Sequence, residues 1–257
     1  MGILAEKNIL VTGVTSHTSI AFAVAQLALA EGANVIVSNL GRALSLTRRV
    51  VHKLTPVPDV IELDVTNEDM LAALPTVLTE RGFERVDAVV HSIAFANPER
   101  ALGGAFLDTQ WGDVATSMQT SAYSLKSLVM AVKPLLVRGS AVVGLTYDST
   151  VSWPDYDWMG VSKAALEAVN RYLARYLGAD GIRCNLVSAG PLDTIAKMAI
   201  PGAHNWDLLW SERAPLGWNP KDASAVGKAV VALLSDWFPA TTGEVIFVDG
   251  GFHSTGA

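Results

Sequence analysis

Cysteine is almost absent from this chain of 257 residues, since Cys184 is the single thiol. One thiol excludes an internal disulfide and is typical of proteins in a reducing compartment, and burial in a strand is its simplest role. Metal-ligand spacing is missing as well. The five histidines, at positions 17, 52, 91, 204 and 253, form no ligand pattern with one another or with Cys184. We therefore expect no metal site.

Basic charge and long apolar runs are also missing. The net charge of -6 provides no basic surface, which argues against nucleic acid and an anionic membrane as partners. No run of eighteen apolar residues is free of charges and helix breakers, so no membrane-spanning helix is expected. The first expected strand begins near Asn8, which leaves no room for a signal peptide. We therefore expect a cytoplasmic protein.

The composition and the order of apolar runs predict the fold class. Hydrophobic residues make up 50% of the chain and charged residues 17%, which fits one large α/β domain whose sheet is buried on both faces. Short β-rich runs alternate with longer helical patterns, and this order predicts a Rossmann-type doubly wound parallel sheet of about seven strands with helices on both faces. No repeat or linker interrupts it, so we expect residues 1–257 to form a single domain.

The boundaries of the elements follow from these patterns. The expected strands are Asn8 to Val11, Asn34 to Ser38, Val60 to Leu63, Ala88 to His91, Ala141 to Leu145, Arg183 to Val187 and Val245 to Val248. The expected helices are Ile20 to Glu31, Asn67 to Arg81, Asp113 to Val137, Tyr156 to Leu177 and Asp222 to Leu234.

The least regular stretch is residues 194–220, here named the lid segment. It contains Trp206, Trp210 and Trp218 and follows the sixth expected strand, at the edge of the sheet where doubly wound folds bind ligands. Trp206 and Trp210 lie four residues apart and would share one face of a helix. The segment is expected either to cover an apolar substrate or to pack on the last helix.

A candidate dinucleotide site begins where the first strand ends. Gly13 follows this strand, and a helix is expected from Ile20. A strand, a glycine turn and a helix start present free backbone N–H groups and a positive dipole end to a pyrophosphate. His17 and Ser19 occupy positions where the usual fingerprint has glycine. We expect Gly13 to allow close backbone approach and Ser19 to cap the helix and donate to a phosphate, although an ordinary capped helix would explain Ser19 alone.

The other strand ends supply further candidates for this ligand. Asp64 closes the third strand, where it is suited either to accept from an adenine amino group, with the next N–H on a ring nitrogen, or to cap a helix. In folds of this type, the end of the fourth strand faces the riboses of the dinucleotide. After the sixth strand, backbone groups can bind the carboxamide of the nicotinamide, and Thr194 can bind the pyrophosphate. The expected cofactor contacts are Gly13, Ser19, Ile20, Leu40, Asp64, Val65, Ser92, Ile93, Ala94, Lys163, Leu192 and Thr194.

The sequence determines the choice between NADH and NADPH less clearly than it predicts the binding site. No acidic residue stands just past the second strand, where many Rossmann sites hold the ribose 2′-hydroxyl and repel a 2′-phosphate. Leu40 suits packing on adenine, whereas Arg42 would attract a 2′-phosphate. NAD (NADH) is expected, and NADPH stays possible.

The most informative pair in the chain is Tyr156 and Lys163. Seven residues at 100° each make 700°, so on a helix the phenol and the ammonium lie about 20° apart and roughly 10 Å along the axis. Both side chains can therefore reach one site. Neither residue belongs to a tyrosine–lysine pair spaced four residues apart, because Gly160 stands four residues after Tyr156 and Met159 stands four residues before Lys163.

These segments together resemble the bacterial enoyl-acyl-carrier-protein reductases, NADH-dependent members of the short-chain dehydrogenase/reductase superfamily. The spacing of seven and the glycine-poor turn separate this branch from the common short-chain dehydrogenases, which place tyrosine and lysine four apart. Trp158, Trp218 and Ser235-Asp236-Trp237 resemble the mycolate-pathway members, but the loop before Arg213 looks shorter. The resemblance covers essentially the whole chain, through Gly13 to Ala21, His91 to Ile93, Tyr156 to Glu167, Ser188 to Pro191, Arg213 to Trp218 and Asp236 to Gly243.

The resemblance implies that NADH reduces the trans-2 double bond of an enoyl thioester, carried by acyl-carrier protein or coenzyme A, in fatty acid synthesis. Tyr156 matches the donor to the thioester oxygen, and Lys163 matches the residue that holds the nicotinamide ribose. Tyr147 matches an aromatic position in the active site, with packing on the lid segment as the alternative. The implied substrate contacts are Phe95, Ala96, Tyr147, Tyr156, Met159, Trp206 and Trp210. A homotetramer is implied too, and the apolar residues 245–252 would permit packing across a two-fold axis.

Two other functions stay open at this point. A ketoacyl or other carbonyl reductase of the same superfamily predicts a serine about thirteen residues before the tyrosine, where this chain has Val143. A non-catalytic NAD(P)-binding sensor would keep Gly13 and Asp64 but would not need Tyr156 and Lys163 at this spacing.

Overall fold

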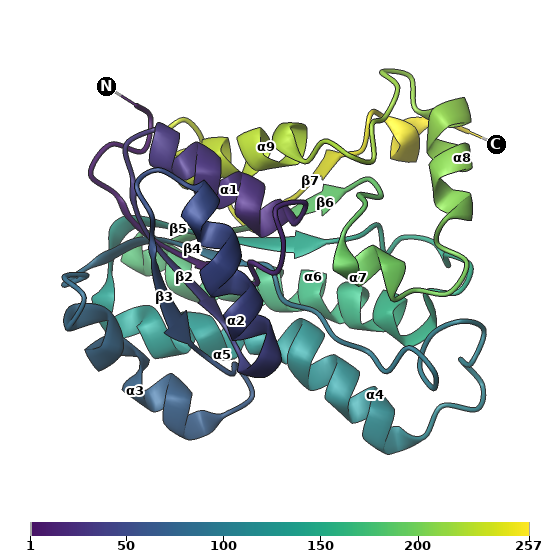
Figure 1. Cartoon of the computed structure of the whole chain (residues 1–257), viewed down its shortest axis with the longest axis horizontal. Helices are drawn as coiled ribbons and strands as arrows, with labels where there is room; N and C mark the ends of the chain where they lie inside the picture. The colour runs from purple at the N-terminus through teal and green to yellow at the C-terminus, as the bar shows by residue number, and fades with distance from the viewer. Residues whose placement is uncertain (1, 257) are drawn as a thin grey trace.

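The computed structural model describes residues 2–256 and contains a seven-stranded sheet in the order β3-β2-β1-β4-β5-β6-β7 (Figure 1). Every neighbouring pair of strands is parallel, which confirms the expected Rossmann-type doubly wound fold class. The strands are β1 Asn8–Thr12, β2 Asn34–Asn39, β3 Asp59–Glu62, β4 Val86–His91, β5 Leu136–Thr146, β6 Arg183–Ala189 and β7 Val245–Val248.

Helices cover both faces of the sheet (Figure 1). One apolar layer packs α1 and α9 against it, and the other packs α3, α5 and α6. The α-helices are α1 Ile20–Ala30, α2 Gly41–Val50, α3 Glu68–Thr79, α4 Trp111–Met118, α5 Ser124–Val132, α6 Asp157–Leu177, α7 Ile195–Met198, α8 Asn205–Arg213 and α9 Ser224–Leu234. Short 3₁₀ turns are η1 Val51–Lys53, η3 Lys133–Leu135, η4 Gly178–Asp180 and η5 Phe252–Ser254, and η2 Gln119–Tyr123 is a π-helical turn.

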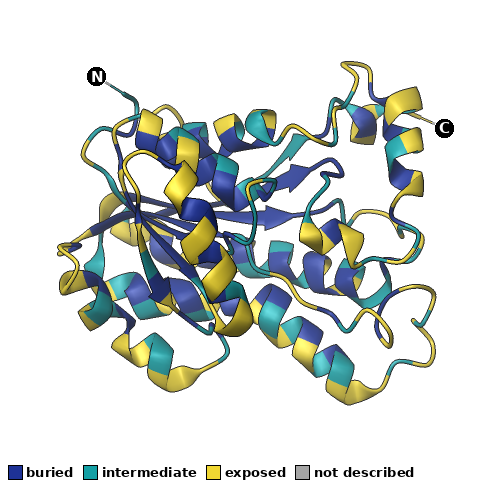
Figure 2. Cartoon of the chain, viewed as in Figure 1, coloured by how far each residue is buried: buried dark blue, intermediate teal, exposed yellow. Residues whose placement is uncertain are grey.

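The central strands form because their β-branched and aliphatic residues are buried on both faces. Every residue of β4 and of β6 is buried, and Figure 2 shows the middle of the sheet almost entirely in dark blue. The chain leaves β1 for β2 on one side, and β4 lies on the other side of β1. A crevice therefore opens at the carboxyl ends of β1 and β4, which is the usual ligand position in doubly wound folds.

Two helical regions differ from those expected from the sequence. The helix α2 was not expected, because only Leu44, Thr47 and Val50 of its ten residues are buried and Leu40 provides no side-chain cap. The expected helix from Asp113 to Val137 is divided by the π-helical turn, and β5 already begins at Leu136. The apolar run there has no clear period, and pairing of Leu136 with Val86 decides in favour of the strand.

The lid segment folds into α7, a loop and α8. Trp206 and Trp210 share one buried face of α8, as the spacing predicts, with 3% and 2% of their surfaces exposed. The Trp210 ring stacks on Phe252 at 3.8 Å between centroids. Arg213, at the end of α8, lies over the Phe252 ring of this stack. Its guanidinium donates to the carbonyls of Thr255 and Gly256 at 3.3 and 3.1 Å. The C-terminal turn thus closes the outer side of α8.

Candidate active site

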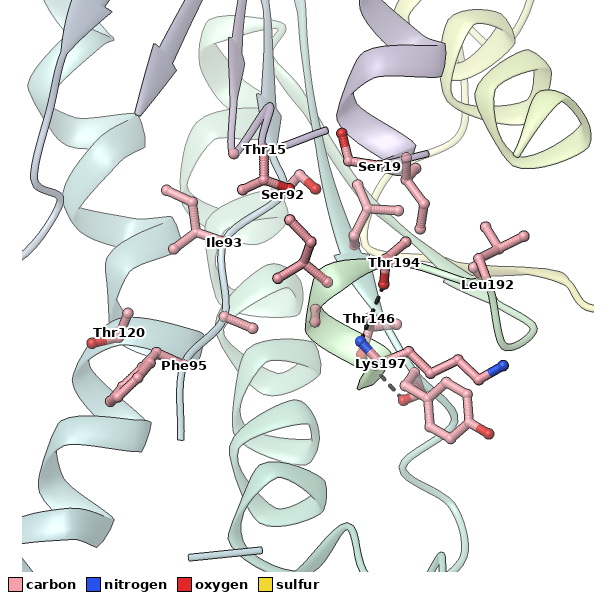
Figure 3. Close-up of a pocket in the computed structure, with 18 of the residues that line it drawn as sticks. Thr15, Ser19, Ser92, Ile93, Phe95, Thr120, Thr146, Leu192, Thr194 and Lys197 are labelled. Carbon is pink, nitrogen blue, oxygen red and sulfur yellow. Dashed lines mark hydrogen bonds between the residues drawn. The ribbon is translucent and has the colours of Figure 1, made fainter. Parts of the chain in front are cut away.

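A cavity of about 710 Å³ lies at the carboxyl ends of β1, β2, β4, β5 and β6. All twelve residues expected to contact a cofactor line it. Figure 3 shows several of them, with Ser19 and Ser92 near the first turn and Thr194 beside Lys197. The parallel sheet explains this convergence, because residues that follow different strands meet at one edge.

The turn after β1 packs closely against the end of β4. Gly13 has a φ of +79°, and a Cβ there would lie 1.9 Å from the Ser92 carbonyl oxygen, so no other residue fits. Ser19 is the N-cap of α1, where its Oγ accepts from the Phe22 N–H at 3.3 Å. The same hydroxyl donates to the Ser16 carbonyl at 2.7 Å. The cap expected for Ser19 is therefore confirmed, and its contact with a phosphate stays a prediction.

Asp64 lines the cavity and also stabilises a local turn. Its Oδ1 accepts from the Thr66 N–H and from the Thr66 hydroxyl, at 2.8 and 2.7 Å. Leu40, which is 42% exposed, lines the cavity as well. A carboxylate that the sequence reasoning missed lies close by, because Glu62 accepts from the Gly41 N–H at the start of α2, at 3.4 Å. Arg42 is exposed and is not part of the cavity wall.

Tyr156 and Lys163 both line the cavity, as expected, although Tyr156 is the N-cap of α6 and the helix begins at Asp157. Each is 6% exposed, and the Lys163 ammonium donates to the Leu145 carbonyl at 2.9 Å. The Tyr147 ring packs edge-on against Tyr156 at 5.2 Å and stacks on Trp206 at 5.2 Å. The Tyr147 hydroxyl is buried and has no hydrogen-bond partner among the described residues. An unpaired buried hydroxyl costs free energy, so this oxygen is a candidate contact for a ligand.

Burial determines the protonation of the site. It lowers the pKa of Lys163 to about 8, although the carboxylate of Glu167 opposes this shift, so the ammonium form still dominates at pH 7. Burial also raises the pKa of Tyr156 well above its ordinary value. The pKa of Tyr147 is raised by burial first and by its neighbour Tyr156 second. Both phenols therefore keep their protons at neutral pH and can donate hydrogen bonds.

A buried histidine lies beneath these groups. Burial, helped by the charge of Lys163, lowers the pKa of His91 to about 3, so its ring is neutral. Its Nε2 lies 2.7 Å from the Ser124 hydroxyl.

The seven expected substrate contacts divide into two groups. Four of them line the cavity: Phe95, Tyr147, Tyr156 and Trp206. The other three, Ala96, Met159 and Trp210, pack in the same apolar cluster but are not part of the wall. The indole of Trp210 is fixed by donation to the Asp249 carbonyl at 3.1 Å, and a Cβ on Gly190 would lie 2.8 Å from that nitrogen. Their contact with substrate stays a prediction.

Several wall residues were missed by sequence reasoning, and Lys197 is the most informative. Its ammonium forms ion pairs with Asp193 and Asp207, which ties α7 to α8. Its backbone N–H donates to the Thr194 hydroxyl at 3.2 Å, and Figure 3 shows the two residues side by side. The i,i+4 spacing of Asp193 and Lys197 was a usable signal. The other missed residues with polar side chains include Thr15, Asn39, Thr120 and Thr146.

Within residues 2–256, no three or more His, Cys, Asp or Glu side chains are grouped as a metal ion would require. None of the helices in that range has both the length and the apolar character needed to cross a membrane.

Comparison with known proteins adds a family and several relatives. The family model described as "Enoyl-(Acyl carrier protein) reductase" matches residues 13–253. The enoyl-[acyl-carrier-protein] reductase [NADH] of Mycolicibacterium smegmatis is 45% identical, over 97% of each chain. The protein of the same name from Mycobacterium avium is 43% identical, again over 97% of each chain. The FabI protein of Aquifex aeolicus, also named an NADH enoyl-[acyl-carrier-protein] reductase, is 36% identical over 100% of this chain and 94% of its own.

Proposed function

This chain belongs to the enoyl-(acyl carrier protein) reductase family, and from that premise we propose that Tyr156 and Lys163 carry out its reaction. The enzyme reduces the trans-2 double bond of an enoyl thioester on acyl-carrier protein with NADH, in fatty acid synthesis. The observation that carries the proposal is that the two side chains share one cavity with a glycine turn suited to a dinucleotide.

The residues of the cavity fit a nicotinamide dinucleotide. Gly13 lets the turn after β1 pack directly on the Ser92 carbonyl, and the start of α1 provides the N–H groups and the dipole that a pyrophosphate needs. Both hydrogen bonds to the Asp64 carboxylate go to Oδ1, so Oδ2 suits an adenine amino group. Near the start of α2, the Glu62 carboxylate disfavours a further phosphate, which supports NADH over NADPH.

The chain's own groups then account for the chemistry at the thioester. When bound, NADH supplies a hydride to the β-carbon of the substrate. Tyr156 donates a hydrogen bond to the thioester oxygen, where negative charge develops as the double bond is reduced. Because this bond strengthens only as the charge appears, it lowers the barrier rather than the ground state. Lys163 holds the ribose hydroxyls and places a positive charge near the developing enolate.

The aromatic wall has a second role, which is to exclude water. Tyr147 and Trp206 form a stacked pair beside Tyr156, and the electrostatic effect of a phenol grows as water leaves the site. The unpaired Tyr147 hydroxyl is suited to a second hydrogen bond to the substrate. We therefore place Tyr147 in the catalytic set.

The carbonyl-reductase alternative lacks its serine. The corresponding position, Val143, lies in the middle of β5 and is completely buried in the apolar core, so no hydroxyl reaches the cavity from it. The sensor alternative requires no catalysis. Mixing the protein with crotonyl-coenzyme A and NADH, and following the nicotinamide absorbance, tests the reaction directly. Oxidation of NADH supports the reductase, and its absence with both this thioester and an enoyl-acyl-carrier protein would reject it.

We propose that the lid segment, residues 194–220, limits the length of the acyl chain. The ion pairs of Lys197 hold α8 so that Trp206 closes one side of the cavity. Each buried methylene contributes roughly 0.8 kcal/mol, so affinity rises with chain length only while the cavity continues. We expect catalytic efficiency to rise from four carbons and to level off by about twelve.

The side chain that tests this limit is Trp206, because Trp210 packs behind the wall. In the variant Trp206→Ala the plateau should move to longer chains, since the wall is shortened. Trp111→Ala, at an indole that is 77% exposed on α4, is the control and should keep the wild-type profile. Steady-state constants for enoyl thioesters of four, eight, twelve and sixteen carbons measure the effect. A wild-type profile that climbs through sixteen carbons would contradict the proposed lid.

We propose a homotetramer. The edge strand β7 keeps its four apolar residues only half-buried, and Tyr172 and Tyr176 on α6 stack on each other while 64% and 73% exposed. Apolar groups left exposed in two places suit burial across two-fold axes. Light scattering coupled to size exclusion should give four times the mass of the chain, and a monomer at micromolar concentration would overturn the assignment.

A further inference from the structure

The backbone on both sides of Tyr156 has an unusual conformation. Asp155 and Asp157 have φ angles of +64° and +41°, in the left-handed region that residues with a side chain rarely adopt. Such residues persist only where their surroundings hold them in place, and they cluster at functional sites. The position of the Tyr156 phenol therefore depends on what holds its two neighbours.

A turn from another part of the chain holds Asp157. Gly103 and Gly104 have φ angles of +71° and +88° and form a turn whose N–H groups at residues 104 and 105 converge on one anion. The carboxylate of Asp157 is this anion: its Oδ2 accepts from the Gly104 N–H at 2.7 Å and from the Ala105 N–H at 3.0 Å. Hydrogen bonds to an ionised group are stronger than those between neutral groups.

The same turn binds the other neighbours of Tyr156. The Gly103 N–H donates to the Asp155 carbonyl at 2.9 Å. The Trp158 indole donates to the Phe106 carbonyl at 3.0 Å, and the two rings stack at 5.0 Å between centroids. Tyr156 itself is fixed by backbone hydrogen bonds within 153–160, whereas its hydroxyl makes no hydrogen bond to the described residues. The carboxylate of Asp157 is the one ionised side chain in this set of contacts.

We propose that Asp157 is a positioning residue for Tyr156: its carboxylate, bound by two N–H groups of the turn at residues 103–105, fixes the left-handed backbone that directs the phenol into the cavity. The inference rests on the proposed role of Tyr156. Its expected consequence is on turnover, because a displacement of about 1 Å at a reacting group lowers the rate by as much as about a hundredfold. NADH affinity should not change, since Lys163 lies two helical turns away.

Three variants separate the carboxylate from the backbone strain. Asp157→Gly removes the carboxylate but accepts a positive φ without cost, so the fold is retained. Asp157→Asn keeps one oxygen that can accept from both N–H groups, because in the wild type both donate to the single atom Oδ2. Asp155→Gly relieves the same strain on the other side of Tyr156 and serves as the control, because the Asp155 carboxylate makes no hydrogen bond to the described residues.

The measurements are kcat and KM for crotonyl-coenzyme A, the Kd of NADH by fluorescence titration, and the Tm of each variant. We expect kcat of Asp157→Gly to fall at least about tenfold with the Kd of NADH within about twofold. Asp157→Asn should recover kcat to within about threefold of wild type, and Asp155→Gly should stay within about twofold.

Three results would overturn this role for Asp157. They are a wild-type kcat in Asp157→Gly, an equal loss in Asp155→Gly, or a loss in Asp157→Gly that is matched by weaker NADH binding and a lower Tm. A wild-type protein that reduces no enoyl thioester would instead reject the proposed function, so the two failures are distinguishable.

Discussion

Replacing Tyr156 by phenylalanine is expected to lower kcat about 10²- to 10³-fold, the usual loss when one donor to a developing oxyanion is removed. The phenol is buried, and burial keeps its pKa well above the ordinary value, so at neutral pH it acts as a hydrogen-bond donor and not as a phenolate. The hydrogen bond is made chiefly to the charge that appears during reduction. The loss should therefore appear in kcat at saturating substrate, and the Kd of NADH should stay within about twofold.

The control for this variant is Tyr123→Phe, at a phenol that is 53% exposed in the π-helical turn η2, which should leave kcat unchanged. Turnover must be measured where chemistry is rate-limiting, which a primary isotope effect with deuterated NADH establishes. A Tyr156→Phe enzyme with wild-type turnover under those conditions would mean that another group donates to the oxygen. Tyr147→Phe would then be the next variant, because the Tyr147 ring lies against Tyr156.

Removing the ammonium of Lys163 should weaken NADH binding about ten- to a hundredfold, the range for hydrogen bonds to a charged group. Lys163→Ala leaves a void in a buried site, so Lys163→Met, which keeps most of the apolar stem, is the better variant. The preferred chain length of the enoyl substrate should not change. Fluorescence titration with NADH measures the effect, and Lys133→Ala, at a partly exposed lysine paired with Asp180, is the control.

The pKa of about 8 for Lys163 gives this binding a pH dependence. The ammonium is charged below that value, so the Kd of NADH should be constant near pH 7 and rise as the pH passes 8. The Lys163→Met variant should lack this rise. The folded pKa lies below the unfolded value, so between pH 8 and about 10.4 the unfolded chain binds more protons and Lys163 makes stability increase with pH. An equal Kd for NADH in wild type and in a folded Lys163→Met variant would remove Lys163 from the cofactor site.

The sequence was sufficient for the sheet and for half of the residues that line the cavity. The cofactor candidates converge because residues that follow parallel strands meet at one edge, whatever the loop geometry. Tyr156 and Lys163 line one cavity, as expected, but Tyr156 is the N-cap of α6 and Asp157 has a positive φ, so helical periodicity does not by itself explain their proximity. Their contacts with NADH and substrate are still predictions.

Other features depended on contacts that no local pattern encodes. Trp206 and Trp210 have the same spacing signal, yet only Trp206 reaches the cavity, because Phe252 and the Asp249 carbonyl from the end of the chain engage Trp210. The turn that holds Asp157 uses backbone N–H groups of Gly104 and Ala105, which lie more than fifty residues earlier in the sequence. Backbone groups carry no residue signature, so only the folded chain reveals this partner.

The contacts of Arg213 have a practical consequence for protein engineering. Because this side chain holds the carbonyls of Thr255 and Gly256 while Phe252 stacks on Trp210, the C-terminal turn and α8 move as one unit. A purification tag or a fusion partner appended at that end would transmit its strain to α8 and distort the measured acyl-chain selectivity. The opposite end offers a safer attachment point, since Ile3 is anchored to Glu31 beside α1, on the far side of the molecule from α8 (Figure 1).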